Sequence, residues 1–128
     1  MNHSPEEANR VTETIIGAAI EVHKALGPGF LESIYEEALC VELTLRGVRY
    51  TRQAPVAVDY KDHRIGESRL DLLVEDTVVV EPKAVEALAP VHTAQVISYL
   101  KAAGCQIGLL INFNVKRLTE GIRRIIHD

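Results

Sequence analysis

Asp71, Glu81 and Lys83 have the side-chain types and the spacing that metal-assisted chemistry requires. Glu81 and Lys83 are two residues apart, so on a β-strand their side chains lie on the same face. Residues 75–77 form a polar turn between two apolar runs, and antiparallel pairing of those runs brings Asp71 toward the end that carries Glu81. Two carboxylates on apolar strands are costly to bury unless a cation compensates them.

Mg²⁺ or Mn²⁺ is the cofactor that this trio favours, because such hard cations take oxygen ligands and keep waters and substrate phosphates in their shell. The carboxylates of Asp71 and Glu81 would hold the ion. Lys83 would orient or deprotonate the attacking water, or offset charge in the transition state. The alternative is a cross-strand salt bridge beside an exposed edge, with no chemical role.

Further candidates lie on the predicted helices. Gln95 and Tyr99 are four residues apart, so they share a helix face and either contact a substrate phosphate and orient Lys83, or belong to the core. His23 lies on an apolar stripe, where a histidine is either a hydrogen-bonded core residue or an additional metal ligand. Glu32 lies in the first turn of a predicted helix, where an acidic side chain interacts favourably with the helix dipole and needs no further role.

Charge is unevenly distributed along the chain. The net charge is −4, which argues against wrapping nucleic acid by bulk electrostatics. Residues 1–45 carry eight acids against two bases, whereas residues 46–128 carry twelve bases against ten acids. A basic cluster near the C-terminus, including Arg117, either binds substrate phosphates or is simply solvated.

The hydrophobic pattern predicts the elements that position these residues. Helical spacing follows the Ser4 cap and ends at Gly27, and a second helical stretch, with Leu31, Ile34 and Tyr35 on one face, ends at Gly47. Strand patterns then predict a hairpin over residues 55–74 and a second over residues 70–80. The remaining predicted elements are a helix over residues 90–103, a strand over residues 107–111 and an amphipathic helix over residues 118–126.

This order predicts an α/β fold with a mixed sheet. Four or five strands would be flanked by helices, and the strand after the helix over residues 90–103 would pair in parallel through a crossover. The length of 128 residues fits a single domain over residues 1–128.

Composition points to a protein of the cytoplasm. No apolar run approaches the roughly twenty residues of a membrane helix, so we expect no membrane partner. The N-terminal residues lack the pattern of a signal peptide. Cys40 and Cys105 have neither metal-ligand spacing nor the density of a disulfide scaffold.

Several motifs together resemble a known family. Asp71 followed by Glu81-Pro82-Lys83 is similar to the D…E-x-K signature of the PD-(D/E)XK nuclease superfamily, and the stretch from Gln95 to Tyr99 is similar to the Q-x-x-x-Y motif of its exonuclease-like branch. The stretch from Gly29 to Tyr35 reproduces the G-x-x-E-x-x-Y motif that names the GxxExxY family. The motifs occur in the family's order and cover almost the whole chain.

The resemblance implies a restriction-endonuclease-like core and a nuclease that hydrolyses DNA or RNA. It implies Asp71 and Glu81 as metal ligands, Glu32 as a residue that reaches the metal directly or through water, and Lys83 as the base or electrostatic stabiliser. The resemblance also implies that the middle residue of E-x-K contributes its backbone carbonyl to the metal, and Pro82 retains that carbonyl. Proline is disfavoured in a central strand, so we expect either a bulge that re-aims Lys83 or a site that has drifted from catalysis.

The alternative function is a catalytically inactive nuclease-fold module that binds a protein or nucleic-acid partner, or forms a homo-oligomer. The acidic N-terminal half and Pro82 favour this alternative.

Overall fold

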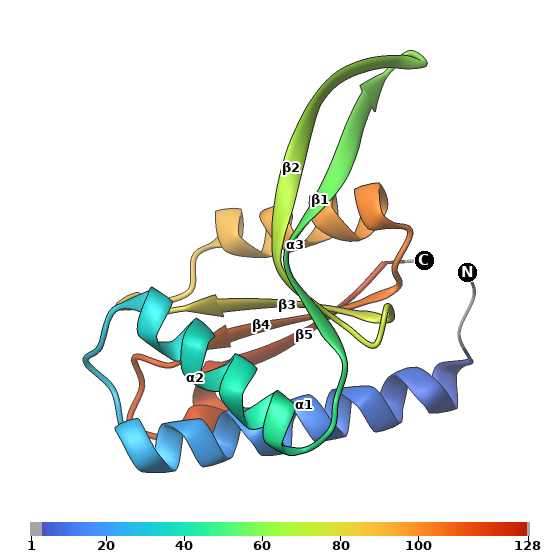
Figure 1. Cartoon of the computed structure of the whole chain (residues 1–128). Helices are drawn as coiled ribbons and strands as arrows, with labels where there is room; N and C mark the ends of the chain where they lie inside the picture. The colour runs from blue at the N-terminus through green and yellow to red at the C-terminus, as the bar shows by residue number, and fades with distance from the viewer. Residues whose placement is uncertain (1–3, 128) are drawn as a thin grey trace.

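The computed structural model describes residues 4–127, which form a five-stranded mixed sheet with helices on both faces (Figure 1). The elements in chain order are α1 (Pro5–Leu26), α2 (Glu32–Leu45), β1 (Tyr50–Tyr60), β2 (His63–Val74), β3 (Val78–Lys83), α3 (Pro90–Ala103), β4 (Ile107–Asn112), η1 (Leu118–Gly121) and β5 (Ile122–Ile126). This architecture confirms the expected α/β class with a mixed sheet. Residues 1–3 and 128 of the expected domain lie outside the described range.

The sheet order follows the chain, from β1 at one edge to β5 at the other. β3 and β4 pair in parallel, joined by α3, and the other neighbours pair antiparallel. The pairing of β2 with β3 is short, running from Val74 opposite Val78 to Leu72 opposite Val80. The pairing of β3 with β4 continues to Lys83 opposite Asn112. The second half of β3 therefore has a strand partner on one side only.

Apolar side chains fill both faces of the sheet. On one face, α1 and α2 bury Ile15, Leu39 and Leu43 against strand residues such as Leu72 and Leu109. On the other face, α3 packs Val96 and Leu100 against a second set of strand residues: Leu70, Val79, Leu110 and Ile125. Between residues 4 and 127, no helix is long and apolar enough to cross a membrane.

Helix ends follow the capping residues of the sequence. Ser4 Oγ accepts a hydrogen bond from the Glu7 amide at 3.1 Å, and Pro5 occupies the first turn of α1, as predicted. α3 ends at Gly104, whose φ of 69° lies in the left-handed region that glycine adopts without penalty. The predicted bounds of α1 and α3 are confirmed.

The predicted C-terminal helix over residues 118–126 is wrong. The segment forms the short 3₁₀ helix η1 and then β5, which pairs antiparallel with β4. Leu118, Ile122 and Ile125 have helical spacing, but β5 covers the edge of β4 that would otherwise remain unpaired. A Cβ on Gly121 would lie 2.2 Å from the Asn112 carbonyl oxygen, so the turn into β5 requires glycine.

The buried face of α2 also differs from the predicted one. Tyr35 and Leu39 are fully buried as predicted, but Leu31 is 75% exposed and Ile34 is 44% exposed. α2 carries two apolar stripes, and periodicity alone does not say which stripe faces the sheet.

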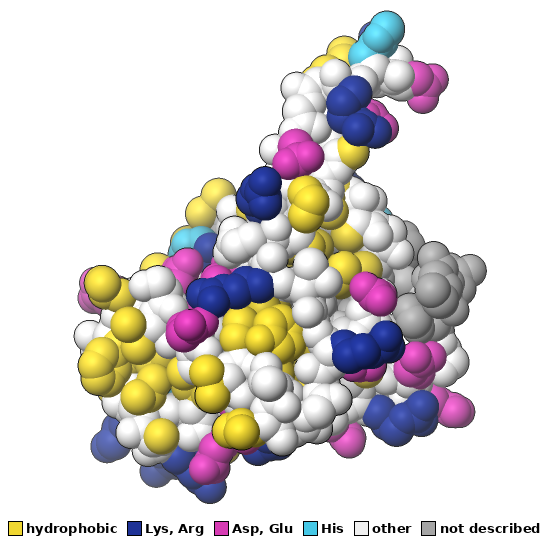
Figure 2. Space-filling view, in the orientation of Figure 1, with side chains coloured by type: hydrophobic (Ala, Val, Ile, Leu, Met, Phe, Trp, Pro, Cys, Tyr) yellow, Lys and Arg dark blue, Asp and Glu magenta, His cyan; other side chains and the backbone are white. Residues whose placement is uncertain are grey.

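The β1–β2 hairpin extends well beyond the rest of the sheet (Figure 1). Its turn at Lys61 and Asp62 lies inside the hairpin that the sequence predicted over residues 55–74. Because β2 pairs with β3 only from Leu72 to Val74, the outer part of the hairpin is a two-stranded ribbon. This ribbon carries charged side chains of both signs (Figure 2).

Candidate active site

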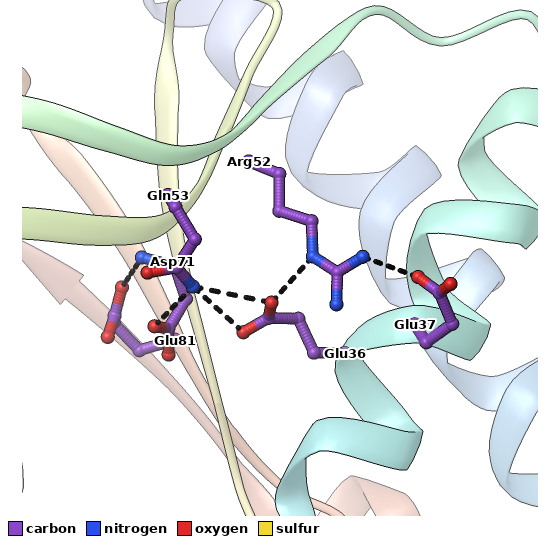
Figure 3. Close-up of polar contacts among 6 residues, drawn as sticks. All are labelled: Glu36, Glu37, Arg52, Gln53, Asp71 and Glu81. Carbon is purple, nitrogen blue, oxygen red and sulfur yellow. Dashed lines mark hydrogen bonds and ion pairs between the residues drawn. The ribbon is translucent and has the colours of Figure 1, made fainter.

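Asp71 and Glu81 come together where β2 and β3 stop pairing (Figure 3). The last pair of that ladder is Leu72 with Val80. One residue further along each strand, Glu81 Oε2 accepts a hydrogen bond from the Asp71 backbone amide at 2.9 Å. A side-chain carboxylate thus takes the place of a strand as the partner of this amide.

Glu81 is an unusual residue for a sheet interior, because it is an acid and the residue is only 2% exposed. Burial, and after it the nearby negative charge of Asp71, raise the pKa of Glu81 to about 9, although the Asp71 amide and Lys83 act to lower it. The buried carboxyl group therefore holds a proton at neutral pH unless another positive charge arrives. A divalent cation is such a charge.

Lys83 lies at the end of β3 and points toward α3. Its Nζ donates to Gln95 Oε1 at 3.2 Å, and Gln95 Nε2 donates to the Tyr99 hydroxyl at 3.0 Å. Gln95 and Tyr99 are half-buried and share a helix face, as predicted. The side chain of Gln95 therefore joins Lys83 to Tyr99 and fixes the direction of the Lys83 ammonium.

Pro82 does not distort β3. Pro82 pairs with Ile111 and Lys83 with Asn112 without a shift of register, so the bulge, one of the two alternatives that the sequence left open, is absent from the pairing of β3 with β4. The Lys83 carbonyl accepts from the Phe113 amide at 2.9 Å and therefore faces β4. Because successive residues direct their peptide groups to opposite edges of a strand, the Pro82 nitrogen and carbonyl face β2, where the ladder has ended. The proline thus breaks no ladder bond, and its carbonyl faces the Asp71 side.

Glu32 approaches the same place from the first turn of α2. Burial raises the pKa of Glu32, and of the nearby charges Lys83 lowers it while Asp71 and Glu36 raise it. Glu32 thus belongs to the electrostatic environment of the trio. Tyr35 supports this turn, because its hydroxyl donates to the Gly27 carbonyl at 2.6 Å and accepts from the Phe30 amide at 3.1 Å.

Glu36, Arg52 and Gln53 belong to the site but were not among the residues predicted from the sequence (Figure 3). Gln53 Nε2 lies 3.3 Å from Asp71 Oδ1 and 3.3 to 3.4 Å from the two carboxylate oxygens of Glu36. Arg52 Nε donates to Glu36 Oε2 at 2.7 Å, and Arg52 Nη1 lies 2.5 Å from Glu37 Oε2. One signal was present, since Glu36 follows Glu32 by four residues and so shares its helix face.

Two predicted residues lie apart from this network. His23 is buried, and its Nε2 lies 2.8 Å from the Val115 carbonyl oxygen, which is the core role that the sequence left open. Arg117 is exposed in the turn before η1. In the described part of the chain, no hydrogen bond or ion pair joins His23 or Arg117 to the carboxylates.

The donor set around Asp71 fits a hard divalent cation that takes only a few of its ligands from the protein. Among residues 4–127 there is no group of three or more His, Cys, Asp or Glu side chains placed to hold a metal ion. Two adjoining carboxylates remain, one of them buried and prone to hold a proton, with the Pro82 carbonyl on the same side. Mg²⁺ commonly binds through one or two carboxylates and fills its shell with water and phosphate oxygens.

Comparison with known proteins gave one match. The model of a family described as the PD-(D/E)XK nuclease superfamily matches residues 9–125, which is nearly the whole chain. The curated proteins and the solved structures that were searched contained no match.

Proposed function

The chain belongs to the PD-(D/E)XK nuclease superfamily, and we propose that it is a Mg²⁺- or Mn²⁺-dependent nuclease that hydrolyses phosphodiester bonds of DNA or RNA. The contact between Asp71 and Glu81 carries this proposal. A buried glutamate whose carboxylate binds the amide of a neighbouring aspartate is an unfavourable arrangement without a cation. It becomes a favourable one when a cation binds.

In the proposed mechanism, Asp71, Glu81 and the Pro82 carbonyl hold the ion. A bound divalent cation supplies Lewis acidity and lowers the pKa of a bound water. Lys83 donates one N–H to Gln95, which leaves its other two N–H groups to orient the attacking water and to stabilise charge on the phosphoryl group. Gln95 positions Lys83, while Tyr99 and Arg117 contact the substrate backbone.

We further propose membership of the GxxExxY family. Each residue of its motif has a distinct structural role. Gly29 has a φ of 110°, Glu32 is the first residue of α2, and the Tyr35 hydroxyl donates a hydrogen bond to the Gly27 carbonyl in the turn before α2. We also propose that residues 1–128 act as one domain in a reducing cytoplasm, which the two free cysteines support.

The test is a cleavage assay with single- and double-stranded DNA and RNA in Mg²⁺, Mn²⁺ or EDTA. Lys83→Ala should reduce metal-dependent hydrolysis by about 10²- to 10⁴-fold, because it removes the group that orients the water. Its circular dichroism spectrum and melting temperature should stay close to those of the parent protein. Lys24→Ala, which changes an exposed lysine at the end of α1, is the matched control. Full activity of Lys83→Ala would refute the mechanism.

A second candidate function, binding rather than catalysis, is favoured by the outer stripe of α2. Leu31, Ile34, Val41 and Leu45 are 44 to 76% exposed, and hydrophobic side chains gather over this region of the surface (Figure 2). The stripe, together with Ala38, repeats at alternating steps of three and four residues, which is the spacing of a helix-pairing seam.

A second copy of the chain is the partner that this stripe fits best. Its side chains run large, β-branched, small, β-branched, large about Ala38, so in an antiparallel copy related by a twofold axis each side chain meets one of the same kind, with Ala38 against Ala38 at the centre. The stripe exposes roughly a few hundred Å², enough for the apolar centre of an interface of about 800 Å² per partner. Light scattering should show a dimer that Leu45→Glu converts to a monomer. A monomeric parent protein would exclude this candidate.

A further inference from the structure

Gln53 interrupts the β1–β2 ladder at the register position that faces Asp71. The pairs on either side, Arg52 with Leu72 and Ala54 with Leu70, keep the same register. Gln53 has a φ of 53°, in the left-handed region that side chains other than glycine rarely adopt within a strand. The other four non-glycine residues with positive φ in the described chain lie in the two hairpin turns: Lys61, Asp62, Glu75 and Asp76.

No turn explains the conformation of Gln53, because β1 continues on both sides of it. A strained backbone conformation persists only where the surroundings hold it. Here the Gln53 carbonyl accepts from Arg69 Nη1 at 3.1 Å, and the Gln53 side chain reaches the carboxylates of Asp71 and Glu36. The strain therefore coincides with contacts to two acids of the site.

The Gln53 amide group suits these contacts chemically. Its NH₂ carries two donors and can serve two carboxylates at once, with Nε2 at 3.3 Å from Asp71 Oδ1 and from Glu36 Oε2. Glu36 is also bound by the Arg52 guanidinium, which balances its charge. Asp71 thus connects to α2 through Gln53 and Glu36.

A neutral donor has an advantage over a cationic one at this position. A lysine or arginine beside Asp71 would pair with the carboxylate and compete with a divalent cation for it. The Gln53 amide fixes the direction of Oδ1 while leaving the negative charge of Asp71 uncompensated. A partner of a metal ligand that acts in this way orients the ligand without supplanting the metal.

We propose that Gln53 is a positioning residue, which holds the Asp71 carboxylate in the orientation that binds the divalent cation. This inference rests on the proposed metal-dependent function. Gln53 touches neither the cation nor the substrate, and it acts through Asp71, with Glu36 and Arg52 anchoring it to α2.

Gln53→Gly separates this role from a structural one. Glycine adopts the left-handed conformation without penalty, so the variant should be as stable as the parent protein or more stable. It lacks the amide that orients Asp71, so Mn²⁺ affinity measured by calorimetry should fall about 10- to 100-fold. The Mn²⁺ concentration for half-maximal cleavage should rise in parallel, while KM for the nucleic acid stays unchanged. Gln53→Met keeps a similar length, removes both donors and adds no charge, and it should also lose Mn²⁺ affinity.

The outcomes distinguish this inference from the proposed function. Gln106→Ala, at an exposed position before β4, is the matched control and should bind Mn²⁺ like the parent protein. If the parent protein binds Mn²⁺ but cleaves nothing, the proposed function fails, and the affinities of the Gln53 variants still decide the positioning role. Unchanged Mn²⁺ affinity in a folded Gln53→Gly, or no Mn²⁺ binding by the parent protein, would overturn the inference.

Discussion

The two halves of β3 have different surroundings although they belong to one strand of six residues. Val78, Val79 and Val80 pair with β2 on one side and with β4 on the other. Glu81, Pro82 and Lys83 pair with β4 alone. All three valines are fully buried, whereas the second half carries a buried carboxyl group and a half-buried ammonium. The candidate site residues of β3 thus begin where its pairing with β2 ends.

This difference shows how a buried strand accommodates charged groups. In the first half, strand neighbours satisfy the backbone on both edges. In the second half, the edge toward β2 lacks a ladder partner, so the Glu81 carboxylate bonds the Asp71 amide and proline occurs without loss of a ladder bond. Substitutions that exchange the properties of the two halves test this comparison.

The largest effect on stability is expected from Val80→Pro. Val80 and Pro82 are two residues apart, so their peptide groups face the same edge, but Val80 pairs with Leu72 across it. Proline at position 80 removes a ladder bond, leaves its buried partner on β2 unpaired and loses part of the packing of the fully buried Val80, so the free energy of unfolding should fall by about 3 kcal/mol or more. Urea denaturation followed by circular dichroism measures the change. A loss below about 1 kcal/mol would show that the first half of β3 does not depend on pairing with β2.

Glu81→Gln should stabilise the protein in the absence of metal. Glutamine resembles the protonated glutamate that the site holds at neutral pH, and it keeps an oxygen for the Asp71 amide. The free energy of unfolding at pH 7 in EDTA should rise by at most about 3 kcal/mol, because pH 7 lies above the ordinary pKa of 4.5 and below the folded pKa. The same variant should lose metal-dependent cleavage. A destabilised variant would mean that Glu81 is charged and compensated in the metal-free protein.

The pH dependence of Glu81→Gln provides its internal control. The pKa of Glu81 is about 9 in the folded protein, against an ordinary value of 4.5. Between these values the unfolded chain has released a proton that the folded chain retains, so a rise in pH favours unfolding. The parent protein in EDTA should therefore lose up to about 1.4 kcal/mol per pH unit relative to Glu81→Gln. Parallel curves for the two proteins would contradict the raised pKa.

Pro82→Val should have the smallest effect. No ladder bond depends on the proline, so the main change is greater conformational freedom of the unfolded chain, which costs at most about 1 kcal/mol. Metal-dependent cleavage should remain, because valine offers the same backbone carbonyl. A loss of stability as large as that of Val80→Pro would remove the distinction between the two halves of β3.

Local sequence signals predicted the parts of the site that depend on one strand or one helix. The spacing of Glu81 and Lys83 predicted their common face, and the turn after Val74 predicted that Asp71 would approach them. Gln95 and Tyr99 were placed on one face of α3 by their spacing, and they are hydrogen-bonded.

Features that depend on distant contacts could not be predicted in this way. No local sequence signal predicts the left-handed conformation of Gln53, because its hydrogen-bond partners Glu36 and Asp71 are 17 and 18 residues away along the chain. The strand β5 resembles a helix in its apolar spacing and is determined by the free edge of β4. The metal ligation itself stays a prediction.

The hydrogen bond from the Asp71 amide to Glu81 offers a spectroscopic probe of the site. The strength of that bond depends on whether the Glu81 oxygen carries a proton, a negative charge or a cation. The nitrogen-15 and proton shifts of Asp71, and the rate at which its amide exchanges with deuterium, should therefore follow the state of a side chain that those experiments do not observe directly. A single resonance would then report occupancy of the site in solution, before any substrate is known.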